Sequence, residues 1–177
     1  MPQHSMHDDV ERVLLSQDQI QERIKALGEE ITRDYSGRSP HLVTILKGSI
    51  PFLADLIRAM NCPLSLDVMA VASYAGHQSS GAVRLTKDLD DSIEGRHVLV
   101  VEDIIDTGLT LTYLQEILRA RAPRRIRTAC LLSKPSRRKV NVPIDYVGFS
   151  IEDQFVVGYG LDYNERWRGL PYIAVVS

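Results

Sequence analysis

The segment with the clearest potential for chemistry spans residues 98–111 and reads VLVVEDIIDTGLTL. Its first four residues are apolar, which is typical of a buried strand. Two adjacent acids, Glu102 and Asp103, follow directly. Because a carboxylate at the end of a buried strand is costly unless it meets a cation or hydroxyl groups, the pair indicates either a polar ligand or a strand end that is open to solvent.

The next feature is a turn of sequence DTGLT at residues 106–110, which opens a predicted helix. Small residues let the backbone wrap closely around a ligand, and the free N–H groups of a helix start bind phosphate. Thr107 and Thr110 add hydroxyl donors. Taken alone, the turn also fits an ordinary aspartate N-cap. The pattern is not a P-loop, which requires Gly-Lys-Ser/Thr, and it lacks the three spaced glycines of a dinucleotide-binding turn.

Predicted strands and helices alternate around this segment. Ser16 and Gln19 form a capping-box signature, and apolar residues at helical spacing follow, so a helix is predicted over 17–35. Further helices are predicted over 50–60 and 109–121. Apolar or alternating runs predict strands at 42–46, 64–70, 83–86, 98–101, 126–132, 146–149, 155–159 and 173–175. The small, polar residues 75–82 predict an exposed loop.

This alternation predicts an α/β fold with a parallel-rich, twisted sheet flanked by helices. Ligands in such folds bind at the carboxyl ends of the strands. The turn at 47–49 and the segment 102–110 both follow strands, so we expect them to meet in one site. No repeat or linker indicates a second domain, and residues 1–177 are predicted to form a single domain with a flexible tail over 1–9.

Composition narrows the possible classes of function. The 177 residues carry a formal net charge of −2, so a general attraction to nucleic acid is not expected. No apolar run approaches the roughly 20 residues of a membrane span, and the first nine residues lack a signal-peptide core. Cys62 and Cys130 lack the spacing of a metal or redox motif. We therefore predict a cytoplasmic protein that does not bind membranes.

Residues 101–111, VEDIIDTGLTL, resemble the motif with which type I phosphoribosyltransferases bind 5-phosphoribosyl-1-pyrophosphate (PRPP). The isoleucine pair between the acids is most similar to the hypoxanthine-guanine phosphoribosyltransferase branch, in its short bacterial form. Further segments resemble that branch in the same order, and the resemblance extends from about residue 20 to 175. They are the pyrophosphate loop at 46–49 (LKGS), the flexible loop that starts at Ser73-Tyr74, and the purine pocket at 132–135 (LSKP) and 155–165 (FVVGYGLDYNE).

The resemblance implies a purine salvage reaction, in which hypoxanthine or guanine displaces pyrophosphate from PRPP with Mg²⁺ as cofactor. Asp106 is then the catalytic general base that accepts a ring proton from the purine. The residues implied to hold the 5′-phosphate are Thr107, Gly108, Leu109 and Thr110. Relatives often carry a polar or basic residue in place of Leu109; backbone donors survive that difference, but a side-chain contribution is lost.

The resemblance also implies how the metal and the pyrophosphate are held. Glu102 and Asp103 face the ribose hydroxyls and one Mg²⁺, and Asp162 binds a second Mg²⁺, because this cation prefers carboxylate oxygens and water. The residues implied to bind pyrophosphate are Lys47, Gly48 and Arg168. Without the resemblance, Lys47 would be an ordinary surface lysine. A cis peptide bond between Leu46 and Lys47 is implied as well.

A small purine-binding hood, built mainly from residues 145–177, is the last element that the resemblance implies. Lys134 donates to the purine O6, which disfavours adenine because its 6-amino group is itself a donor. Phe155 stacks on the base and Val156 offers main-chain hydrogen bonds. Asp162 also belongs to the implied purine-binding residues. Taken alone, Lys134 fits a solvated lysine and Phe155 a core aromatic. Ser73 and Tyr74 begin the loop that closes over the reaction and excludes water.

Two other functions fit the same residues. A xanthine-preferring relative would share every motif, and an RNA-binding regulator that keeps the fold would use the basic residues clustered over 119–139. Few aromatic residues lie among these arginines, which gives little support for stacking on bases. We therefore expect the cluster to be a solvated or subunit-contact surface, with no nucleic-acid partner. The family suggests a homodimer or homotetramer.

Overall fold

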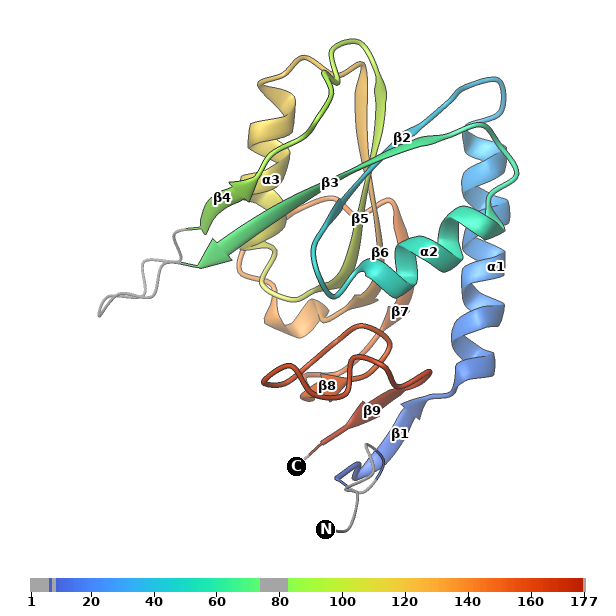
Figure 1. Cartoon of the computed structure of the whole chain (residues 1–177), viewed down its shortest axis with the longest axis vertical. Coiled ribbons are helices and arrows are strands. Elements are labelled where there is room, and N and C mark those ends of the chain that lie inside the picture. Colours follow the sequence, from blue (N-terminus) through green and yellow to red (C-terminus); the bar gives the residue numbers. More distant parts are fainter. Residues whose placement is uncertain (1–6, 8, 74–82, 177) are drawn as a thin grey trace.

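The computed structural model describes residue 7 and residues 9–73 and 83–176 (Figure 1). The larger of its two sheets contains β2 (His41–Ile45), β3 (Ser65–Ser73), β4 (Val83–Lys87), β5 (His97–Ile105), β6 (Arg125–Ser133) and β7 (Tyr146–Ser150). These strands lie in the order β4-β3-β2-β5-β6-β7. β4 pairs antiparallel with β3, and the remaining pairings of this sheet are parallel.

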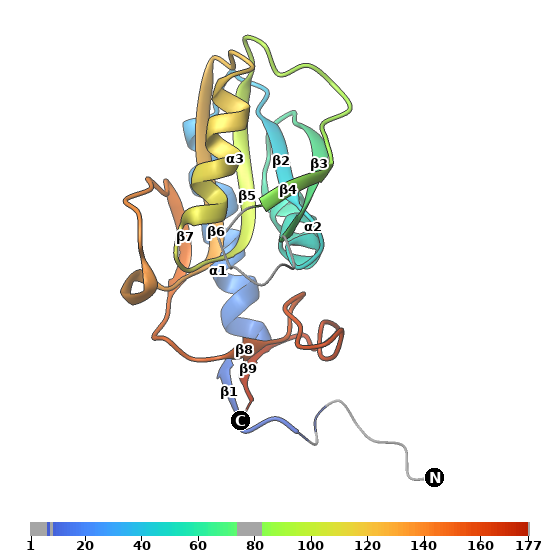
Figure 2. The same cartoon turned by 90° about the vertical axis from the view of Figure 1, so that its left-hand side faces the viewer.

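Helices cover both faces of this sheet, as Figure 2 shows. They are α1 (Gln17–Asp34), α2 (Ile50–Ala59) and α3 (Leu109–Arg119). Side chains alternate along β5: Leu99 and Val101 pack in the core formed with α1 and α2, whereas Val98 and Val100 pack in the core formed with α3. A strand that is buried on both faces reads as a continuous apolar run. The predicted α/β fold with a mostly parallel central sheet is confirmed.

The start of α1 matches its predicted capping box. The Gln19 N–H donates to Ser16 Oγ at 3.2 Å, and the Ser16 N–H donates to Gln19 Oε1 at 2.9 Å. Further along, a Cβ atom on Gly28 would lie only 2.5 Å from the Ala59 carbonyl oxygen. The absence of a side chain at Gly28 therefore lets α1 and α2 pack in close contact.

Several strands differ in length from the prediction, and two of these differences bear on the site. β5 continues to Ile105, because its backbone keeps pairing with β6 from Glu102↔Cys130 to Ile105↔Ser133. The two acids consequently lie inside a strand and not beyond its end. β8, by contrast, contains only Val156–Val157, because Gly158 and Tyr159 adopt positive φ angles of 96° and 49° that end an extended strand.

The second sheet joins the two ends of the described chain. It has the order β1-β9-β8 and is antiparallel, with β1 spanning Arg12–Leu15 and β9 spanning Ile173–Val175. β1 was not predicted, since four residues carry too little periodicity, and it forms because Arg12 and Val13 pair with Val175 and Ala174. We use "hood" for this sheet together with the loops between residues 151 and 172.

Some expectations concern residues that the structure does not describe. Tyr74 and the predicted exposed loop over 75–82 lie outside the described residues, as does most of the predicted tail over 1–9. Ser73 is the last residue of β3. Among the helices of the described residues, none combines the length and the apolar character that crossing a membrane requires.

Candidate active site

The carboxyl ends of β2 and β5 border a cavity of about 220 Å³. The acid pair Glu102 and Asp103 forms one wall, and the turn over residues 106–110 forms another. The loop after β2 closes the third side with Leu46 and Gly48. The two turns that were predicted to meet at one edge of the sheet therefore do so.

The acid pair is electrostatically unusual. Only 8% of Glu102 is exposed, and this burial, together with the charge of Asp103, raises the pKa of Glu102 well above its ordinary value. Burial also raises the pKa of Asp103, although the Ile104 N–H, which donates to Asp103 Oδ1 at 2.7 Å, acts in the opposite direction. A buried carboxylate beside a half-buried one favours a site that receives a cation or several hydroxyl donors.

The donor set fits a metal that is shared with a ligand. In the described part of the chain, no group of three or more His, Cys, Asp or Glu side chains could enclose a metal by itself. Mg²⁺ usually keeps several waters and binds through one or two carboxylates plus phosphate oxygens of a substrate. Glu102 and Asp103 offer that kind of partial oxygen site.

The loop after β2 packs closely against the Asp103 side chain and against the backbone of the hood. A Cβ atom on Gly48 would overlap Asp103 Oδ2, well inside the 3.0 Å that real Cβ contacts respect, and one on Gly160 would overlap the Gly48 carbonyl oxygen. Gly160 also has a φ of 96°. The peptide between Leu46 and Lys47 is cis, as the family resemblance implies. Glycine is therefore required at position 160, and at position 48 it lets the loop approach the Asp103 carboxylate without displacing it.

The turn at 106–110 has an exposed and a buried side. The Asp106 side chain is about half exposed; the Thr107 N–H donates to its Oδ1 at 2.5 Å. Gly108 is the N-cap of α3 with a φ of 83°, and a Cβ there would lie 2.9 Å from Val142 Cγ1. Leu109 is 41% exposed, so its apolar side chain is not part of the core.

A second cavity of about 320 Å³ adjoins the first, since Gly48, Asp103 and Ile104 line both. Lys134 lies buried in its wall, with its Nζ atom 3.8 Å from Asp153 Oδ1. The cavity is also lined by Lys47, Phe155, Val156, Leu161, Asp162 and Arg168. The residues predicted for base and pyrophosphate binding are therefore gathered around one space.

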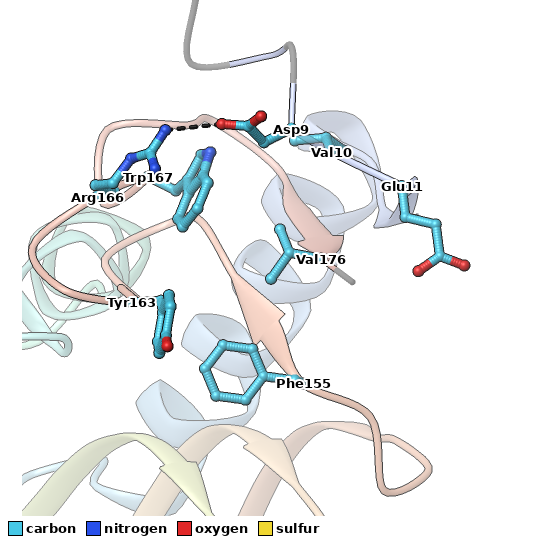
Figure 3. A pocket seen from close by; sticks show the side chains of 8 residues that line it. All are labelled: Asp9, Val10, Glu11, Phe155, Tyr163, Arg166, Trp167 and Val176. Carbon is cyan, nitrogen blue, oxygen red and sulfur yellow. Dashed lines mark hydrogen bonds and ion pairs between the residues drawn. The ribbon is translucent and has the colours of Figure 1, made fainter.

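Phe155 is 52% exposed and meets the Tyr163 ring edge-on, with the ring centres 5.4 Å apart. It is thus an open aromatic wall and not a core residue. Phe155 also borders a wider cavity, together with Tyr163, Trp167 and Val176 (Figure 3). The volume of this outer cavity is about 760 Å³. Neither the acid pair nor Lys134 lines this outer cavity. Although it is larger, we therefore do not expect it to be the site of the reaction.

Arg168 organises the charges of the hood loop. Its Nη2 lies 3.1 Å from Asp162 Oδ1 and 3.3 Å from Glu165 Oε1, and its Nη1 donates to the Gly160 carbonyl at 2.7 Å. Its buried Nε has no hydrogen-bond partner within the described residues. Lys47 Nζ is 3.9 Å from Glu165 Oε1, so both predicted pyrophosphate cations share a carboxylate that an anionic ligand could displace.

Known proteins share the sequence and the fold of this chain. A family model described as "Phosphoribosyl transferase domain" matches residues 15–164. The hypoxanthine-guanine phosphoribosyltransferase of Bacillus subtilis is 51% identical over 173 residues, which cover 97% of this chain and 96% of that protein. The chain belongs to the hypoxanthine-guanine phosphoribosyltransferase family.

Two further relatives extend the comparison. A crystal structure of a hypoxanthine phosphoribosyltransferase from Staphylococcus aureus has a TM-score of 0.94 and 46% identity, and the match covers 100% of this chain and 97% of that one. The bifunctional protein TilS/HprT of Listeria monocytogenes is 50% identical over 174 residues. That match covers 98% of this chain, which spans only 27% of the length of the bifunctional protein.

In this phosphoribosyltransferase, sequence reasoning missed several residues at the site. Ile104 and Leu161 line the second cavity. Strict alternation along β5 would have placed Ile104 on the face of Val98 and Val100, whereas it packs against the core that contains Leu99 and Val101. Arg137 and Arg138 were assigned to a basic surface cluster, but the short 3₁₀ helix η1 (Pro135–Arg137) turns them back toward Asp106. Arg137 Nε lies 3.6 Å from Asp106 Oδ2, and Arg138 Nη1 donates to the Asp106 carbonyl at 2.6 Å.

Other arginines of that cluster have partners inside the fold. Arg121 forms a two-pronged ion pair with Asp88, at 2.7 Å for both contacts. Arg127 lies 3.5 Å from Asp34 and donates to Tyr146 Oη at 2.9 Å. The cluster is thus partly engaged within the chain, and neither the geometry nor the relatives support the RNA-binding alternative.

Proposed function

We propose that the chain is a purine salvage enzyme that transfers the 5-phosphoribosyl group from PRPP to N9 of hypoxanthine or guanine, giving IMP or GMP and pyrophosphate. The observation that carries this proposal is the shared wall between the two cavities. One offers a phosphate-binding turn and acids for a sugar, and the other offers a lysine and an aromatic ring for a base. A sugar carbon at the shared wall would lie within reach of both ligands.

At C1′ the proposed reaction forms one bond and breaks one, and a proton moves from the purine to a carboxylate. N9 of the base attacks C1′ of the ribose, and the C1′–O bond breaks with its electron pair leaving on pyrophosphate. The purine loses a ring proton, which Asp106 is proposed to accept near N7. Its half-exposed carboxylate at the mouth of the first cavity supports this role, because such a group can reach a ligand.

The proposed sugar and phosphate contacts follow the polarity of the first cavity. Backbone N–H groups of Thr107, Gly108, Leu109 and Thr110 would hold the 5′-phosphate at the start of α3. Glu102 and Asp103 would accept from the ribose hydroxyls and hold Mg²⁺, with Asp162 holding a second ion. When bound, Mg²⁺ neutralises charge on the pyrophosphate oxygens. Lys47, Gly48 and Arg168 would bind the pyrophosphate.

The proposed base contacts explain selectivity for a 6-oxopurine. The Lys134 ammonium has donors and no acceptor, so it matches O6 and disfavours a 6-amino group. Its burial supports this role, since a buried lysine requires an acceptor and Asp153 is 3.8 Å away. Phe155 would stack on the base and Val156 would bond its edge through the main chain. Closure by Ser73, Tyr74 and the following loop remains a proposal.

The decisive experiment measures steady-state kcat/KM for hypoxanthine, guanine, xanthine and adenine with saturating PRPP and Mg²⁺. We expect turnover with hypoxanthine or guanine and little with adenine. A clear preference for xanthine would favour the xanthine-preferring alternative, and no turnover with any base would refute the proposed function. A cytoplasmic location and a homodimeric or homotetrameric state stay predictions, which fractionation and sedimentation would test.

A further inference from the structure

One hydrogen bond joins the hood to the helix that follows the pyrophosphate loop. The Tyr159 hydroxyl donates to the Asp55 carboxylate of α2 and also lies 3.3 Å from the Pro51 carbonyl oxygen. Tyr159 is 6% exposed, and its backbone has a φ of 49°, in the left-handed region that non-glycine residues rarely adopt. The Tyr159 N–H donates to the Leu170 carbonyl at 2.8 Å. Side chain and backbone thus hold this residue in one conformation.

Asp55 ties this bond to the rest of the helical layer. Its carboxylate accepts from Gln21 Nε2 of α1 at 3.0 Å and pairs with Arg58 one turn along α2. The Asp55 side chain is only 18% exposed. Burial raises the pKa of Tyr159, and the adjacent Asp55 raises it further, so the phenol keeps its proton as a donor. The bond is therefore a partly buried, charge-assisted contact and not a loose surface pair.

The two residues of this bond are close in sequence to residues that line the two cavities. α2 begins at Ile50, three residues after Lys47, so Asp55 belongs to the helix that directly follows the pyrophosphate loop. On the hood side, Gly160 follows Tyr159 and packs on the Gly48 backbone, and Asp162 lies two residues further on. Arg168 also donates to the Gly160 carbonyl. The loop that carries the hood ligands is therefore attached to the sheet beside this bond.

We propose that the Tyr159–Asp55 bond, named the hood latch, positions the base cavity relative to the sugar-phosphate cavity. It acts through Gly160 and Asp162 and touches no reacting atom, so both of its members are positioning residues. The inference rests on the proposed function, because it assumes that one ligand spans the two cavities. If this is so, loss of the latch lowers the affinity for ligands that fill both cavities. The affinity for ligands that fill only the sugar-phosphate cavity should stay the same.

A second buried tyrosine provides a matched control. The Tyr146 hydroxyl donates to Asp34 Oδ2 at 2.6 Å and links the end of α1 to β7. Like the latch, it is a partly buried tyrosine–aspartate bond between a helix and a strand-bearing segment. Unlike Tyr159, Tyr146 lies in the larger sheet and not in the hood, and it lines neither cavity of the site. A variant at Tyr146 therefore reports the cost of such a bond to stability without any effect on the alignment of the hood.

The experiment compares Tyr159→Phe with Tyr146→Phe by calorimetric titration of two ligands into the whole chain of residues 1–177. IMP spans the phosphate turn and the base cavity, whereas ribose 5-phosphate reaches only the turn and the acid pair. For Tyr159→Phe we expect the Kd of IMP to rise about ten-fold and that of ribose 5-phosphate to change less than about two-fold. For Tyr146→Phe we expect the ratio of the two Kd values to match the parent.

A conservative variant separates alignment from general damage. Asp55→Asn keeps an oxygen that accepts from Tyr159 and should retain most of the parent ratio, whereas Asp55→Ala should behave like Tyr159→Phe. Equal ratios in Tyr159→Phe, Tyr146→Phe and the parent would refute the latch while leaving the proposed function intact. A parent enzyme that binds ribose 5-phosphate but not IMP would refute the proposed function, and the role of the latch with it.

Discussion

Replacing Gly48 by alanine tests the geometry that joins the two cavities. An alanine Cβ at this position would overlap Asp103 Oδ2, and its distance would fall far short of the 3.0 Å that real Cβ contacts keep. The φ of Gly48 is not positive, so alanine suits the backbone itself. The carboxylate or the loop must therefore move by about 1 Å, the scale of misplacement that costs about 10²-fold in rate when it affects a catalytic constellation.

We expect Gly48→Ala to lower kcat/KM for hypoxanthine by about 10²-fold while the melting temperature changes little. The change in the free energy of unfolding is small because alanine reduces the conformational entropy of the unfolded variant. This effect contributes about 0.4–1 kcal/mol and offsets part of the local strain in the folded state. The assay is steady-state kinetics at saturating PRPP and Mg²⁺, accompanied by thermal unfolding of the same preparation.

Gly37→Ala is the control, because Gly37 has a φ of 73° but an alanine Cβ at this position would meet no atom within 4 Å. It should lower the melting temperature through backbone strain alone and leave kcat/KM unchanged. If Gly48→Ala retains kcat/KM within about three-fold of the parent, the close approach of Gly48 to Asp103 does not align the site, and our account of the shared wall is wrong.

Four further outcomes are expected. Asp106→Asn should lower the single-turnover rate by about 10²–10⁴-fold with PRPP affinity retained; an unchanged rate would remove Asp106 as the base. Lys134→Gln should reduce the hypoxanthine-to-adenine ratio of kcat/KM by about ten-fold or more, and an unchanged ratio would show that Lys134 does not read O6. EDTA should abolish turnover and Mg²⁺ restore it, so activity without metal would contradict the proposed cofactor. Glu102→Gln should raise the melting temperature of the ligand-free enzyme more at pH 8 than at pH 4.5: the folded pKa of Glu102 lies above its ordinary 4.5, so its ionisation destabilises the fold as pH rises through that range. A gain that is equal at both pH values would contradict that shift.

Much of the fold could be predicted because its signals are local. The capping box of Ser16 and Gln19 and the helical spacing after it set the start of α1. The apolar run at 98–101 needs only its own side chains to indicate a strand that is buried on both faces. The alternation of such segments was sufficient to predict the α/β class, and the motif around Glu102 and Asp106 was sufficient to identify the family.

Other features required contacts between residues far apart in the chain. Arg12 joins a strand only because Val175 lies beside it, and η1 turns Arg137 from the expected surface cluster toward Asp106. The need for glycine at position 48 comes from Asp103 and cannot be read from neighbouring residues. Local sequence determines which backbone conformations are favourable, whereas these pairings depend on the three-dimensional packing that brings the two ends and the middle of the chain together.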